Sequence, residues 1–278
     1  MVILPHKVPI STSSKREKWN MLQSNKLLEI KLADQNPKYA IIFSIITARV
    51  SKFMEPKQKR QLERDQVSQK RRQEIIQAAK VVFDRMGIED SKMTDVADEV
   101  EMGVATIYRY FNTKAELAIE TGIDYVNEIL DYFSPVNSRE ASGLKKVEKM
   151  IDRIIELYHE KPQFVRFLQS FDFYFSSSEK NHPRLADFES AILKLHPFLL
   201  DALVEGRKDG SIHTLESRDK DMAALIFRSL IDMEQRILTR DYVLELDQKM
   251  DRDFELQVLK EMILDYLTKK PTTENHPI

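Results

Sequence analysis

The chain has 278 residues, a formal net charge of −2 and no cysteine. The absence of cysteine excludes disulfides, thiolate nucleophiles and cysteine-ligated metal sites, and the length favours two domains. Only 6 glycines and 10 prolines interrupt a sequence rich in Leu, Ile, Glu, Lys and Met, which favours helices over strands. The most apolar segment, residues 39–50, is shorter than the roughly 20 residues of a membrane span. Residues 1–10 lack the apolar run of a signal peptide, so we expect a cytoplasmic protein that contacts no membrane.

The small net charge hides an uneven distribution along the chain. Residues 1–53 have a balance of +6, residues 54–117 are neutral, and residues 118–278 have a balance of −8. Seven basic side chains gather in residues 57–72, which we call the basic arm. They are Lys57, Lys59, Arg60, Arg64, Lys70, Arg71 and Arg72. A basic arm before an acidic body predicts a protein that offers one end to a polyanion, although a solvated charge run has the same composition.

Residues 1–53 show no sustained helical period. Turn-like sequences occur at residues 11–14 and 36–37. We therefore expect a poorly ordered N-terminal extension. Met54 is our hypothesis for the biological start, in which case residues 1–53 are not part of the native protein.

A helical pattern begins near Ser68. Its apolar face carries Ile75, Ile76, Ala79, Val82 and Phe83. Gly87 can end this helix with a left-handed cap. Two short helices are expected next, over residues 93–100 with Ser91 as a candidate cap, and over residues 104–111.

A long helix should follow the two short ones. Thr113 and Glu116 have the spacing of a capping box, with a hydroxyl at the cap and a carboxylate three residues later. This helix should run to about Phe133, because Pro135 cannot continue it. Four or five further helices are expected, one of them over residues 185–205 with a kink at Pro197.

The two short helices and the turn at residues 101–103 have the form of a helix-turn-helix unit. In this unit the second helix enters the major groove of DNA, and the first braces it against the backbone. The second helix must bury one face in order to present the other rigidly. We expect Val104, Ile107 and Phe111 to face inward, and Ala105, Thr106 and Arg109 to face outward.

Residues 106–117, TIYRYFNTKAEL, resemble the TetR family of bacterial transcription regulators, and the resemblance extends over roughly residues 70–120. It implies an all-α fold in which a three-helix helix-turn-helix domain precedes a larger helical ligand-binding and dimerisation domain, with about nine helices. The DNA-binding domain would span residues 54–120 and include the basic arm. The effector-binding and dimerisation domain would span residues 121–270, before a tail at 271–278.

The resemblance also implies DNA-contacting residues, and therefore double-stranded DNA as a partner and association with the nucleoid. Tyr108 and Lys114 match phosphate-contacting positions, and Thr106 can donate to a phosphate or a base. Arg109 could pair with guanine, and Ala105 could touch a thymine methyl. The complete set is Lys92, Thr94, Gly103, Val104, Ala105, Thr106, Tyr108, Arg109, Tyr110 and Lys114. Packing inside the domain is the alternative for Val104 and Tyr110, and solvation of a helix end is the alternative for Lys114.

Glu101 departs from the family, which usually has glycine at this position. Either Glu101 itself takes the tight-turn conformation, or the turn is reshaped around Gly103. Its carboxylate also faces the DNA side, in a segment (residues 73–117) with 5 basic and 9 acidic side chains. We expect the basic arm to compensate, which would make DNA binding steeply salt-dependent.

The later helices should serve dimerisation and effector binding, as the family implies. The last two long helices, 219–239 and 254–267, are the candidates for pairing with a second copy. An aromatic-rich helix after Pro162 could line a cavity for a small apolar or aromatic effector, although ordinary core packing is the simpler interpretation. The candidate pocket residues are His159, Phe164, Phe167, Gln169, Phe171 and Tyr174.

Other classes of function find little support in the sequence. It has no phosphate-binding glycine loop, no dinucleotide motif, and no zinc-protease or serine-hydrolase motif, so we expect neither catalysis nor a cofactor. The 6 histidines show no metal-ligand spacing. The remaining alternative is a helical protein-interaction regulator that binds DNA weakly or not at all. A repressor is the expected form, and an activator stays open.

Overall fold

The computed structural model describes residues 56–134, 142–213, 218–239, 245 and 249–269. The expectations for residues 1–53 and for the tail at 271–278 therefore fall outside the described residues. Contacts divide the chain into two units, Met1–Gln69 and Lys70–Ile278. In the described part of the first unit, residues 56–69 form the beginning of one helix.

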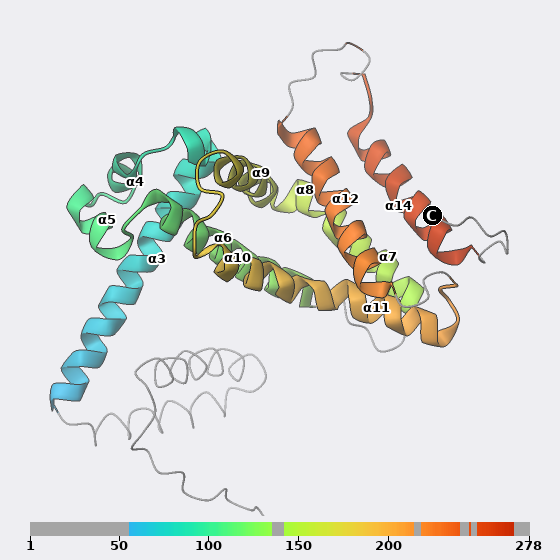
Figure 1. Cartoon of the computed structure of the whole chain (residues 1–278), viewed down its shortest axis with the longest axis horizontal. Coiled ribbons are helices and arrows are strands. Elements are labelled where there is room, and N and C mark those ends of the chain that lie inside the picture. Colours follow the sequence, from blue (N-terminus) through green and yellow to red (C-terminus); the bar gives the residue numbers. More distant parts are fainter. Residues whose placement is uncertain (1–55, 135–141, 214–217, 240–244, 246–248, 270–278) are drawn as a thin grey trace, which may run out of the picture. The chain divides into compact units, whose positions relative to one another are not determined.

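The all-α fold is confirmed, since all regular secondary structure in the described ranges is helical (Figure 1). In chain order the elements are α3 (Pro56–Asp90), α4 (Met93–Glu99), α5 (Val104–Tyr110), α6 (Lys114–Phe133), α7 (Gly143–Ile155), α8 (Leu157–Glu160), α9 (Pro162–Ser177), α10 (Leu185–Ile192), the 3-10 helix η2 (Leu193–Leu195), α11 (His196–Asp209), α12 (Asp219–Thr239) and α14 (Arg252–Thr268). No described helix has both the length and the apolar character needed to cross a membrane.

Helix α3 has the predicted buried face, but the left-handed cap predicted at Gly87 is wrong. Ile75, Ala79 and Val82 are completely buried. Gly87 has φ 76° and ψ 167°, a combination that is almost confined to glycine, so the helix kinks there. Residues 88–90 add a further turn. Ser91 is not the cap of α4, because its hydroxyl donates back to the carbonyl of Ile88.

Helix α6 is capped by Thr113, and only one of the two hydrogen bonds of the predicted capping box forms there. The hydroxyl of Thr113 accepts the backbone N–H of Glu116, and the Glu116 carboxylate accepts the backbone N–H of Asn112. The helix continues without interruption through residues 120 and 121, where the sequence suggested a domain boundary. Its buried residues therefore join the core of the later helices to the helix-turn-helix.

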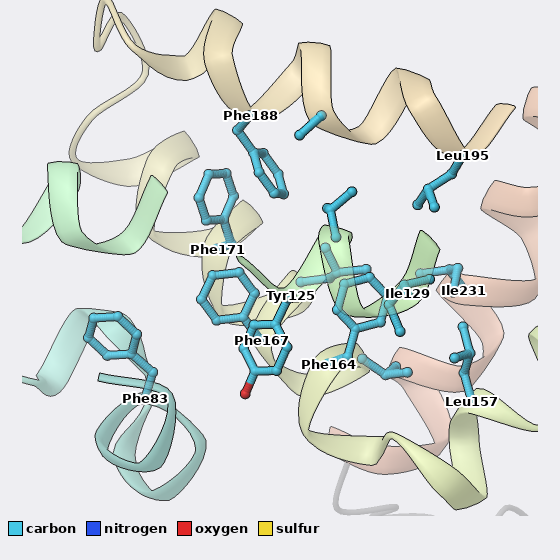
Figure 2. Packing of buried hydrophobic residues seen from close by; sticks show 14 of the residues in the cluster. Phe83, Tyr125, Ile129, Leu157, Phe164, Phe167, Phe171, Phe188, Leu195 and Ile231 are labelled. Carbon is cyan, nitrogen blue, oxygen red and sulfur yellow. The ribbon is translucent and has the colours of Figure 1, made fainter. Parts of the chain in front are cut away.

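Helices α6, α9 and α10 enclose an aromatic cluster (Figure 2). The ring of Phe167 lies 5.0 Å from that of Tyr125 and 5.7 Å from that of Phe171. The ring of Phe171 lies 4.2 Å from that of Phe188. Gly122 permits this approach, because a Cβ there would meet the Phe188 ring at 2.7 Å.

The helix predicted over residues 185–205 is divided into α10, η2 and α11. Pro197 lies in the first turn of α11, where its missing N–H breaks no helical bond, so the predicted kink is a helix boundary. Helix α11 crosses α7 closely at two glycines. A Cβ on Gly143 would lie 1.9 Å from the backbone nitrogen of Gly206, so neither helix can carry a larger residue at this crossing.

Candidate nucleic-acid interface

Helix α5 has one buried face and one exposed face, as a recognition helix requires. Ile107 and the cap residue Phe111 are buried. Ala105 and Arg109 are exposed, and Tyr108 is 49% exposed. The expectation that Val104 faces inward is wrong, because its side chain is 36% exposed at the first position of the helix.

The turn before α5 answers the question raised by Glu101. Its φ is 53°, so this glutamate itself adopts the left-handed conformation. Gly103 has φ −64° and ψ 137° and simply caps α5. The N–H of Met102 donates to the carbonyl of Ala97 at 2.9 Å, which closes the turn. The left-handed conformation strains a residue with a side chain, by roughly 1 kcal/mol.

The remaining DNA-contact candidates divide into exposed and partly covered residues. Lys92 and Thr94 are exposed where α4 begins, and space around the α-carbon of Gly103 is open. Thr106 is half-buried. Tyr110 is also half-buried and packs against the core, which agrees with the packing alternative for this residue.

Lys114 binds backbone carbonyls inside the domain in this conformation, which is an alternative to the expected contact with DNA phosphate. Its Nζ lies 2.6, 2.7 and 2.8 Å from the carbonyl oxygens of Ile88, Glu89 and Ser91. An ammonium group has three N–H donors, so all of them are used. Burial lowers the pKa of this amine, partly opposed by nearby carboxylates, Glu89 first. Lys114 therefore fixes the segment that joins α3 to α4.

Arg72 is a positioning residue that the sequence analysis missed, because it was grouped with the basic arm. Its guanidinium donates to the carbonyl of Tyr110 at 2.9 Å and pairs with Glu120 at 2.8 Å. The same group lies over the Phe111 ring, 4.2 Å from its centroid. Arg72 thus holds the end of α5 against α3 and α6. Its position three residues before Ile75, on the buried face of α3, was the available signal.

The ion pair between Arg72 and Glu120 is part of a network that extends beyond the helix-turn-helix. The Glu120 oxygen that binds Arg72 also accepts from Arg184, at 2.5 Å. Arg184 binds Asp187 at 2.9 Å in the first turn of α10. The end of the recognition helix is therefore linked through charged groups to the later helices.

One face of α9 contacts the helix-turn-helix at intervals of four residues. Arg166 pairs with Asp84 at 2.8 Å, and the hydroxyl of Ser170 accepts the N–H of Ile88 at 2.7 Å. The ring of Tyr174 lies 4.9 Å from the Lys114 ammonium. This spacing places the contacts along one stripe of the helix.

The candidate effector residues fall into two groups. Phe164, Phe167 and Phe171 are buried and lie in the aromatic cluster with Tyr125 (Figure 2). Tyr174 is also buried, and Gln169 is half-buried on the same helix. His159 is separate, since it is exposed on α8 and its Nε2 lies 3.2 Å from an Asp253 oxygen. Across the described ranges, no group of three or more His, Cys, Asp or Glu side chains could hold a metal ion.

Comparison with known proteins supports this interface at the level of the domain. Residues 75–121 match the family model described as bacterial regulatory proteins, tetR family. The HTH-type transcriptional regulator SAB2452 of Staphylococcus aureus is 23% identical over 138 residues, which cover 44% of this chain and 75% of that protein. The uncharacterized HTH-type transcriptional regulator YfiR of Bacillus subtilis is 43% identical over 58 residues, 20% of this chain and 28% of YfiR.

Solved structures show a similar fold over most of the described chain. The transcriptional regulator FadR from Bacillus subtilis, in complex with stearoyl-CoA, has a TM-score of 0.53 and 18% identity, and the match covers 70% of this chain and 98% of that one. A TetR transcription regulator from Haloarcula marismortui has a TM-score of 0.57 and 16% identity, with 72% and 97% covered. At these identities the similarity is one of fold.

Proposed function

Because residues 75–121 carry the DNA-binding domain of the tetR family of bacterial regulatory proteins, we propose that this transcription regulator binds a near-palindromic operator as a homodimer and represses from it. The observation that carries the proposal is the exposed face of α5. Ala105, Tyr108 and Arg109 extend from a helix whose other face is buried at Ile107 and Phe111. This geometry suits insertion into a major groove.

The roles of the exposed residues follow from their chemistry. Arg109 can donate two hydrogen bonds to O6 and N7 of a guanine, and Val104 and Ala105 can contact thymine methyl groups. The hydroxyl of Tyr108 can donate to a phosphate, which positions the helix without reading sequence. Lys92 and Thr94 are the candidates for phosphate contacts from α4. Lys114 is left out, because its donors are occupied within the domain.

The dimer interface is assigned to α12 and α14. Large apolar side chains stand exposed on these two adjacent helices, namely Leu225, Phe254, Met262 and Tyr266. Exposed apolar groups of this size favour burial against a second copy, and a two-fold dimer matches a palindromic site. Met262→Lys should produce monomers in light scattering. Leu193→Lys, at an exposed leucine of η2, should leave the mass unchanged, and a dimer that survives Met262→Lys would contradict the assignment.

Release from the operator is assigned to a small effector bound among the later helices. Helix α9 supports this, because one side of it lies in the aromatic cluster and another contacts α3 and Lys114. An effector that binds one arrangement of α9 better than another would shift the spacing of the two recognition helices. The stearoyl-CoA complex of the similar regulator FadR is a precedent for such a ligand in this fold.

The proposal is tested by selecting binding sites from a random duplex pool with the purified protein. The selected motif should be near-palindromic, with half-sites separated by a helical turn of DNA. Fluorescence anisotropy at increasing salt should show steeply weakening affinity. No enriched motif and no salt-dependent binding would favour the alternative, a helical protein-interaction regulator whose acidic helix-turn-helix does not bind DNA.

A further inference from the structure

Glu234 interrupts the buried apolar stripe of α12. Ile226 and Leu230 precede it on this stripe, and Ile237 follows one turn later. All three are buried, and Glu234 itself is 0% exposed. A carboxyl group therefore occupies a position where the helical spacing calls for an aliphatic side chain.

The carboxyl of Glu234 lacks a partner in the part of the chain that the structure describes. Neither of its oxygens has a hydrogen-bond partner among the described residues. Burial raises its pKa to about 9, and no neighbouring charge contributes to that shift. The nearest cation in sequence, Arg236, is directed elsewhere, since its Nη2 lies 3.0 Å from a Glu255 oxygen.

A buried carboxyl without a partner lowers the stability of the folded protein. A buried polar group without a hydrogen bond destabilises a protein by about 1–3 kcal/mol, and an aliphatic side chain of similar size is often more stable. Within the described residues, the buried charged groups of Lys80 and Asp219 are paired, Lys80 with Asp124 and Glu128 and Asp219 with Arg207. Unsatisfied groups of this kind point to a function that completes them.

Its place in the fold connects Glu234 with the aromatic cluster. Helix α12 packs against α9, the helix that carries Phe164, Phe167 and Phe171. Ile231, one turn before Glu234, lies in the same hydrophobic cluster as Phe164 (Figure 2). The carboxyl therefore lies on the buried side of a helix that packs against α9, and also against α7, α11 and α14.

We propose that Glu234 is the polar contact of an effector site between α9 and α12, and that the effector is an apolar compound with a protonated amine. The inference rests on the proposed effector-released regulator and names the class of its ligand. Because burial keeps the carboxyl protonated near neutral pH, binding of an ammonium group would release that proton, and the ammonium would then donate to both carboxylate oxygens and balance their charge. An anionic ligand would meet a neutral carboxyl and no positive group, so its charge would be buried uncompensated.

Three probes with one ring system test the charge preference by titration calorimetry. They are 1-naphthylmethylamine, 1-naphthalenemethanol and 1-naphthoate, which differ in charge at similar size. The wild-type protein should bind the amine more tightly than the alcohol or the carboxylate, by roughly tenfold or more. An equal or reversed order in the wild-type protein would overturn the proposal.

Two variants assign the preference to this residue. Glu234→Gln keeps the shape and removes the charge, and Glu234→Leu removes both. Each should weaken amine binding roughly tenfold or more and leave alcohol binding little changed. Asp221→Asn, at an exposed carboxylate in the first turn of the same helix, is the control and should bind like the wild-type protein. An undiminished amine preference in both Glu234 variants would overturn the proposal.

Binding to the selected operator separates this inference from the proposed function. Without probe, both Glu234 variants should bind the operator as the wild-type protein does. The amine should release the wild-type protein from the operator and fail to release Glu234→Leu. Absence of any operator for the wild-type protein would contradict the regulator itself, whatever the amine does. Operator binding that the amine does not weaken would contradict this inference alone.

Discussion

The helix-turn-helix and the core around α9 and α12 differ in whether their inner polar groups have hydrogen-bond partners. Around α5 they are satisfied, since Lys114 binds three carbonyls and Arg72 binds a carbonyl and a carboxylate. On α12 the completely buried carboxyl of Glu234 has no partner in the described chain. A reading surface must be rigid before DNA arrives, whereas a sensing site is completed by its ligand.

The largest expected effect concerns the pH dependence of stability at Glu234. The folded-state pKa is about 9 against an ordinary value of 4.5, so between these values the folded protein holds one proton more than the unfolded chain. The free energy of unfolding of the wild-type protein should therefore fall relative to that of Glu234→Gln as pH rises from 5 to 8, by up to about 1.4 kcal/mol per pH unit. Urea unfolding of both proteins measures it. If the free energies of unfolding of the two proteins changed with pH in the same way, the Glu234 carboxyl would be solvated or paired. The helix-turn-helix and the later core would then not differ in this respect.

Lys114 differs from Glu234, because it is a half-buried cation whose three donors are all used. Lys114→Met should lower the free energy of unfolding by about 2–3 kcal/mol, because three carbonyls lose their donor. Lys92→Met, at an exposed lysine, is the control and should change stability little. If Lys114→Met weakened DNA binding at unchanged stability, Lys114 would be a phosphate contact after all.

Variants of Arg72 and of its neighbour Arg71 distinguish a side chain that positions α5 from one that contacts DNA phosphate. Arg72→Met should lower the free energy of unfolding by about 1–2 kcal/mol, discounted for partial exposure, since the Tyr110 carbonyl and Glu120 lose their partner. Operator affinity should fall with an unchanged salt slope. Arg71 is exposed, so Arg71→Met should reduce the salt slope and leave stability unchanged. Identical behaviour of the two variants would show that Arg72 belongs to the basic arm in function.

Glu101 should give the smallest effect. Glu101→Gly removes the left-handed strain and should raise the free energy of unfolding by about 1 kcal/mol, offset in part by glycine's greater freedom when unfolded. It should also bind the operator a few-fold more tightly at low salt. Glu101→Gln keeps the strain and removes the charge, so it should gain affinity without stability. A loss of stability in Glu101→Gly would contradict the strain.

The sequence predicted what depends on short-range spacing. The cap at Thr113, the tight turn and the two short helices follow from residues within four positions of one another, whereas the cap predicted at Ser91 was wrong. Even the left-handed alternative for Glu101 could be stated in advance. Val104 was misplaced because the first residue of a helix has no preceding turn to cover it.

Features that depend on distant partners were not predictable in the same way. The donors of Lys114 point to a segment more than twenty residues earlier, and the stripe of α9 meets α3 across more than eighty residues. Arg72 and Glu234 were accessible in part, because each has the helical spacing of a buried position. Spacing predicts that such a side chain is buried, and only the fold shows whether it has a partner.

Whether α5 reads base pairs through Arg109 can be measured with a double-mutant cycle between protein and DNA. Operator affinity would be measured for the wild-type protein and Arg109→Ala, on the selected duplex and on duplexes with each guanine pair replaced in turn. We expect Arg109→Ala to lose about 1–3 kcal/mol on the selected duplex, and nothing further where its own guanine has been replaced. An equal loss on every duplex would make Arg109 a phosphate contact, and no loss on any duplex would contradict α5 as the recognition helix.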